Sequence, residues 1–100
     1  MDANEFEKRN QSLELLNATH EFPCDFTIKV IGQADDDFVA RVVETVQEAA
    51  TTEERIPYQT KVTPNGKHVS VTMEPRLVSA EEVLFVYDQV KSVRGVVMTL

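Results

Sequence analysis

Three consecutive acidic residues, directly before a helical pattern, form the most chemically distinctive segment of the chain. Asp35, Asp36 and Asp37 follow a β-branched run that we expect to end at Gly32. Short carboxylates at a helix start accept hydrogen bonds from free backbone N–H groups, and simple capping is one interpretation. The other is a ligand loop, because carboxylates can hold an ammonium group and glycine allows close approach to the backbone. The candidate ligand-binding residues here are Gly32, Gln33, Asp35 and Asp36. A ligand at this loop should be a small cationic or zwitterionic metabolite.

A lysine in the middle of the preceding strand is the second candidate. Phe26 and Val30 face one side of that strand, whereas Lys29 lies with Thr27 and Ile31 on the other side. If this side is the open face of a sheet, Lys29 can contact an anionic ligand. The alternative is a surface lysine that keeps a flat sheet soluble or pairs with an acid on a neighbouring strand.

Catalytic and metal chemistry have few candidates. The soft metal ligands are His20, Cys24 and His68, and Pro23 prevents the first two from sharing a helical face. A closed zinc site takes four ligands, and nothing places a base beside Cys24. We therefore expect no catalytic residue, no metal site, no cofactor and no enzyme. The weaker alternative is an unrecognised enzyme whose base is His20, His68 or a perturbed carboxylate.

Composition restricts the class of protein further. One hundred residues with 42% hydrophobic and 27% charged side chains are typical of one small folded domain. Ten basic against 17 acidic residues give a net charge of −7, which argues against a nucleic-acid partner. No apolar run approaches the ~20 residues that span a bilayer, so no membrane partner is expected. With one cysteine and no leader-like start, we expect a cytoplasmic protein.

Hydrophobic periodicity divides the chain into predicted elements. An Asn-Gly turn joins the arms of a hairpin, and a Ser-x-x-Glu capping box starts the second main helix. The predicted elements are a strand at 24–31, a helix at 36–50, a hairpin of 55–63 and 68–74, a helix at 79–91 and a strand at 93–100. We interpret residues 1–21 as an N-terminal extension with a short helix near 12–17, and residues 22–100 as a single domain.

The order β-α-β-β-α-β predicts an α+β, ferredoxin-like sandwich. Four antiparallel strands carry both helices on one face, and the first and third strands are central. The other face is open. It should show Thr27, Lys29, Ile31, Ser70 and Thr72, without the aromatic platform that RNA recognition requires.

Residues 22–34 read Phe-Pro-Cys-Asp-Phe-Thr-Ile-Lys-Val-Ile-Gly-Gln-Ala, and Gly66, Ser70 and Tyr87 follow further along. This pattern closely resembles the YbeD-like family of small bacterial proteins of unknown function. The resemblance implies a ferredoxin-like fold similar to ACT domains, which are regulatory modules that sense small molecules. It carries over no catalytic residue. The function implied is a non-catalytic regulatory module that binds a small molecule, with a protein–protein adaptor as the alternative.

Two apolar residues are candidate partner contacts. Phe85 projects from the charged face of the second main helix. In the last strand, Val97 faces one side, whereas Val96, Met98 and Leu100 face the other. An edge strand with apolar side chains on both faces tends to aggregate unless another segment covers it. We expect the N-terminal extension or a second subunit to cover it, in a homodimer or with a protein partner. Because residues 51–100 carry six acids and six bases, this neutral half is where we expect an acidic partner.

Overall fold

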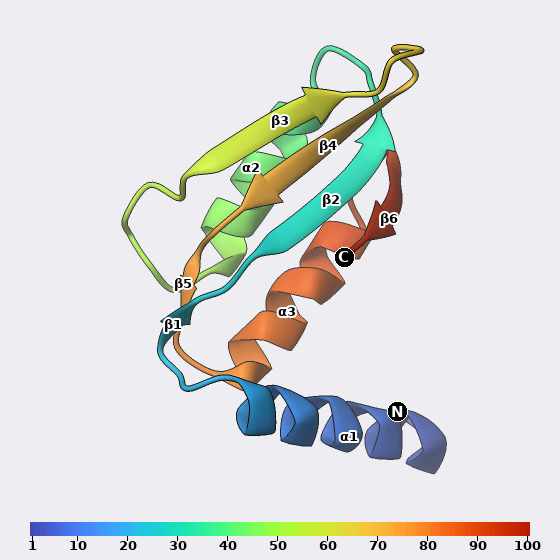
Figure 1. The fold of residues 1–100 in the computed structure, drawn as a ribbon. Helices are drawn as coiled ribbons and strands as arrows, with labels where there is room; N and C mark the ends of the chain where they lie inside the picture. The colour runs from blue at the N-terminus through green and yellow to red at the C-terminus, as the bar shows by residue number, and fades with distance from the viewer.

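Four antiparallel strands form the main sheet in the order β3-β4-β2-β6, with a two-stranded sheet of β1 and β5 at one end (Figure 1). The computed structural model describes residues 1–100. In chain order the elements are α1 (Ala3–Thr19), β1 (Cys24–Asp25), β2 (Ile28–Gln33), α2 (Phe38–Ala49), β3 (Tyr58–Val62), β4 (His68–Met73), β5 (Arg76–Leu77), α3 (Ala80–Lys91) and β6 (Val96–Thr99). The strand order confirms that the first and third main strands, β2 and β4, are central.

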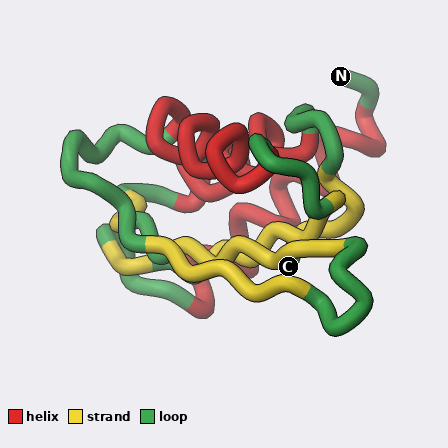
Figure 2. Tube along the Cα trace, turned by 90° about the horizontal axis from the view of Figure 1, so that it is seen from above, coloured by secondary structure: helices red, strands yellow, loops and turns green.

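Helices α2 and α3 cover one face of the main sheet and leave the other open, as the view from above shows (Figure 2). Helix α2 presents Phe38, Val42 and Val46 to this face at a spacing of four residues, which places them on one side of the helix. They pack against alternating buried residues of the central strands, including Val30 and Val71. The ferredoxin-like prediction is therefore confirmed.

The predicted strand at 24–31 is two strands. Its first part, β1, pairs with β5, and next to this pair the Phe26 N–H group donates a hydrogen bond to the Pro75 carbonyl oxygen (2.9 Å). Its second part, β2, continues beyond the predicted end. Gly32 lies inside β2 and pairs with Val69, so the prediction that Gly32 ends the strand was wrong. The glycine is required by packing rather than by a turn.

The predicted capping box at the start of α3 is present in modified form. Ser79 Oγ accepts a hydrogen bond from Glu82 N–H (3.1 Å), as the motif predicts. The Glu82 carboxylate accepts from the backbone N–H groups of Val78 (3.0 Å) and Thr51 (3.0 Å). One carboxylate therefore holds the chain before α3 and the chain after α2 together.

Helix α1 is much longer than the short helix predicted near 12–17. It spans 17 residues, and the Asp2 carboxylate caps it by accepting from Glu5 N–H (2.8 Å). None of its residues is buried. It packs against α3, where Arg9 Nη1 lies 3.9 Å from Asp88 Oδ2, and not along β6 (Figure 1). Of the two expected covers for the last strand, the N-terminal extension is therefore excluded, and a second subunit stays a prediction. No helix is long and apolar enough to cross a membrane.

Strand β6 does not alternate as predicted, because its register shifts against β2. Met98 pairs with Ile31, but Gly32 pairs with Val96, so Val97 is an extra residue in a β-bulge. Val96 packs against the core, whereas Val97 and Met98 are 59% and 50% exposed. The bulge thus exposes two consecutive apolar side chains, a pattern that a regular strand does not produce.

Candidate functional site

The loop after β2, which the sequence presents as the first ligand candidate, is filled by the protein's own side chains. A Cβ atom on Gly32 would lie 2.2 Å from Phe38 Cζ and 2.6 Å from the Gly95 carbonyl oxygen. The close approach that glycine permits is therefore made by the Phe38 ring. Gln33 lies at the exposed end of β2, paired with His68.

Asp35 forms an ion pair with Arg41 of α2. Arg41 Nη2 lies 2.8 Å from Asp35 Oδ2 and also donates to the Arg94 carbonyl oxygen (3.0 Å). The hydrogen bond from Arg41 lowers the pKa of Asp35, and the Asp37 N–H group, which donates to Asp35 Oδ1 (3.0 Å), lowers it further. Asp36 is exposed and in no ion pair. Of the two predicted carboxylates, only Asp36 is left to meet an ammonium group.

Protonating Asp35 is expected to destabilise the fold. Its folded pKa lies below its ordinary value of 3.8, so its contribution to stability is present above pH 3.8 and is lost as the pH falls through the folded value. Asp35→Asn should therefore show a smaller drop in the free energy of unfolding between neutral and acid pH, measured by urea titration. Asp36→Asn is the matched control. An equal acid-induced drop in Asp35→Asn and the parent protein would contradict the assignment.

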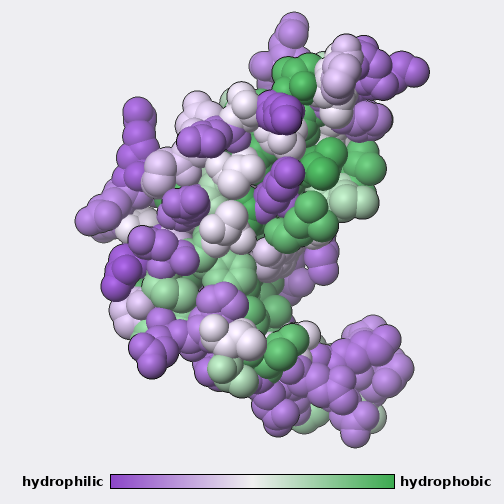
Figure 3. Space-filling model, in the orientation of Figure 1, coloured by the Kyte–Doolittle hydropathy of each residue, from purple (hydrophilic) through white to green (hydrophobic).

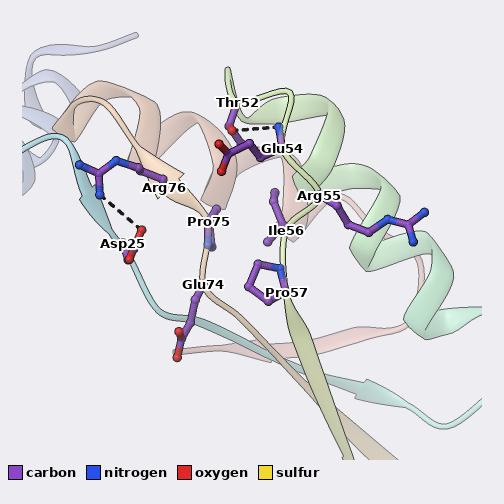
Figure 4. A pocket seen from close by; sticks show the side chains of 9 residues that line it. All are labelled: Asp25, Thr52, Glu54, Arg55, Ile56, Pro57, Glu74, Pro75 and Arg76. Atoms are coloured by element: carbon purple, nitrogen blue, oxygen red, sulfur yellow. Dashed lines mark hydrogen bonds and ion pairs between the residues drawn. The ribbon is translucent and has the colours of Figure 1, made fainter.

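A polar pocket of about 220 Å³ lies at the opposite end of the sheet, between the β1–β5 sheet and the connection from α2 to β3 (Figure 4). Two prolines and a buried isoleucine form part of its wall, and five charged side chains surround it. The nine lining residues are Asp25, Thr52, Glu54, Arg55, Ile56, Pro57, Glu74, Pro75 and Arg76.

The wall of this pocket is held in place by side-chain hydrogen bonds rather than by secondary structure. Gln47 of α2 donates through Nε2 to the Glu54 carbonyl oxygen (2.9 Å) and accepts through Oε1 from Ile56 N–H (3.0 Å). Glu82 of α3 fixes Thr51 at the start of the same segment. Ile56 is only 3% exposed and anchors the segment in the core. The pocket is therefore preorganised before any ligand binds.

Charges of both signs meet at this pocket. The Glu54 carboxylate points toward the side on which Arg76 lies, whereas the Arg55 side chain points away (Figure 4). Arg76 Nη1 lies 3.6 Å from Asp25 Oδ1, but both side chains are more than half exposed, so water screens the pair and it contributes little to stability. Glu54 and Glu74 are in no ion pair. The rim thus offers a guanidinium and separate carboxylates to a ligand that carries both charges.

The open face of the main sheet holds the second candidate, Lys29, which is exposed as predicted. It lines a shallow hollow of about 300 Å³ together with Lys61, which the sequence did not single out. Ile31, Val62 and Pro64 supply apolar walls, and Ser70 also lines the hollow. The hydropathy surface shows this face, with apolar side chains gathered along the β6 side (Figure 3).

The remaining candidates lie apart from one another. Phe85 is 49% exposed on α3. His20 lies beside the Phe26 ring, with 4.9 Å between ring centroids, and Cys24 lies half-buried in β1. No group of three or more His, Cys, Asp or Glu side chains is arranged to hold a metal ion.

The fold and its open sheet define a small ferredoxin-like α+β protein of the ACT-like type. The chain belongs to the family described as protein of unknown function (DUF493), whose model matches residues 17–100. It is 35% identical over 85 residues to a UPF0250 protein of Edwardsiella ictaluri, covering 85% of this chain and 95% of that protein. It is 36% identical over 87 residues to a UPF0250 protein of Serratia proteamaculans, with the same coverage. A UPF0250 protein of Shewanella amazonensis is 33% identical over 86 residues, covering 82% of this chain and 96% of that protein.

These relatives confirm the YbeD-like assignment made from residues 22–34. The family is of unknown function, and the comparisons therefore transfer no catalytic or binding residue to this chain.

Proposed function

We propose that this protein is a non-catalytic regulatory module that binds a small zwitterionic molecule, such as an amino acid, in the polar pocket. The observation that supports the proposal is that Glu54 of the α2–β3 connection and Arg76 of β5 line the same pocket. A ligand carboxylate would pair with the Arg76 guanidinium, whose planar fork suits that group. The ligand ammonium would face Glu54 or Glu74.

Binding at this pocket can regulate because the pocket joins separate parts of the fold. Arg76 belongs to the β1–β5 sheet, whereas Glu54 belongs to the segment fixed by Gln47 and Glu82. A ligand that bridges them stabilises the folded state by about 2.7 kcal/mol at a concentration of 100 times its Kd. It also restrains the two segments relative to each other, which is the change a partner protein can detect.

The test is a thermal-shift screen with the standard amino acids, followed by isothermal titration of any that raise Tm. For such an amino acid, we expect its deamino and decarboxy analogues to bind at least about tenfold more weakly, which is about 1.4 kcal/mol. Arg76→Gln should cause a similar loss. Arg94→Gln is the matched control, because Arg94 is exposed, takes part in no ion pair and does not line the pocket. Absence of a Tm shift with every amino acid, or equal losses in the two arginine variants, would refute the proposal.

A further inference from the structure

The open face of the sheet carries Lys29 and Lys61 around one hollow, in a chain whose net charge is −7. Strand register places Lys29 beside Thr72, and Thr72 beside Gln59. In the next row, Ile31 lies beside Ser70, and Ser70 beside Lys61. Neither lysine takes part in the three ion pairs of the structure. The centre of this face therefore presents two uncompensated positive charges on either side of a small serine side chain.

An apolar strip adjoins the lysines. Ile31 pairs with Met98, and the bulge in β6 leaves Val97 exposed next to it. Figure 3 shows apolar side chains gathered along this side of the sheet. We call the surface formed by Lys29, Ile31, Lys61, Ser70, Val97 and Met98 the open-face groove. An exposed apolar patch beside charged residues is typical of a protein-binding surface.

We propose that the open-face groove binds a segment of a partner protein in which acidic and apolar side chains are neighbours. An acidic side chain lies over Ser70, between Lys29 and Lys61, where both lysines attract it. A neighbouring apolar side chain packs on Val97 and Met98 and removes their exposed surface from water. This site is separate from the polar pocket at the end of the sheet.

Charge selects this occupant over a second copy of the chain. In a symmetric dimer built on this face, each copy presents the same patch to the other. Lys29 and Lys61 of both copies would then approach one another, and like charges brought together at an interface are unfavourable. An acidic segment from another protein avoids this repulsion between lysines, and its apolar side chains can still pack on Val97 and Met98.

The test uses a fluorescein-labelled synthetic peptide with the repeat Glu-Leu-Asp-Val and measures fluorescence anisotropy with the full chain. We expect saturable binding that weakens as salt is raised, and none for the matched peptide with lysine in place of each acid. Lys29→Glu and Lys61→Glu should each weaken binding about tenfold. Lys67→Glu makes the same charge change in the exposed β3–β4 turn, outside the groove, and should leave binding within about twofold of the parent protein. Val97→Asp should also weaken binding.

Several results would overturn this inference. They are absence of binding by the folded protein, equal binding of the lysine peptide, and an equal loss in Lys67→Glu. A dimer in equilibrium sedimentation that Val97→Asp dissociates would assign the face to a second copy. Arg76→Gln should leave peptide binding unchanged, so failure here is distinguishable from failure at the polar pocket.

Discussion

Gly32→Ala is expected to lower the free energy of unfolding by about 3 kcal/mol, at the upper end of the cost of overpacking a core. The added methyl group would lie 2.2 Å from Phe38 Cζ and 2.6 Å from the Gly95 carbonyl oxygen. The Phe38 ring is fully buried and cannot rotate away without displacing its neighbours in the core. The Gly95 carbonyl oxygen belongs to the backbone and cannot move alone, so β2 and the turn before β6 would have to separate.

Urea unfolding followed by circular dichroism measures this loss. Gly66→Ala is the control, because no atom lies within 4 Å of a Cβ atom there, and only the positive φ of +75° opposes the substitution. It should cost about 1 to 2 kcal/mol. In a double-mutant cycle, Phe38→Leu should recover part of the Gly32→Ala loss, since leucine leaves more room. If Gly32→Ala costs no more than Gly66→Ala, the close contact is not the reason for glycine.

The topology was predictable because its signals are local. The alternating residues of β4 and the turn that contains Gly66 each lie within a few positions of one another. The apolar residues on one face of α2, and Ser79 with Glu82 at the start of α3, are also close together in the sequence. Together they determine a β-α-β-β-α-β order, and chain handedness reduces such an order to very few arrangements.

The sequence predictions that were wrong concern features that depend on residues far away in the chain. The β1–β5 pairing joins Cys24 to Leu77, and no residue near Cys24 in the sequence indicates Leu77 as its partner. The β6 bulge is defined only by the register against Ile31 and Gly32. Gly32 was assigned to a strand end because no residue near it in the sequence indicates the Gly95 carbonyl oxygen, which lies against it and belongs to the far end of the chain.

The candidate sites were also predictable only where the sequence signal is local. Lys29 was identifiable because strand alternation alone predicts an exposed position. The ion pair of Arg41 with Asp35 was not predicted, because the Arg41 side chain reaches back from α2 to a residue six positions earlier. Long polar side chains reach partners that spacing along a helix does not reveal, and Gln47 and Glu82 act on the polar pocket in this way.

Gln47→Ala is expected to lower the free energy of unfolding by about 2 kcal/mol, because it leaves two backbone groups without partners. The Ile56 N–H group loses its acceptor beside a side chain that is only 3% exposed, so water replaces the bond poorly. The Glu54 carbonyl oxygen, which belongs to an exposed residue, loses its donor at smaller cost.

Gln47→Glu separates the two contributions. A carboxylate still accepts from Ile56 N–H but cannot donate to the Glu54 carbonyl oxygen, so this variant should lose less stability than Gln47→Ala. Amide hydrogen exchange at Ile56 should accelerate strongly in Gln47→Ala and weakly in Gln47→Glu. Unchanged exchange at Ile56 in Gln47→Ala would show that Gln47 does not hold this segment. If exchange does accelerate, the loosened wall should also weaken binding of any amino acid that the polar pocket takes, because that ligand would then have to order the segment on binding.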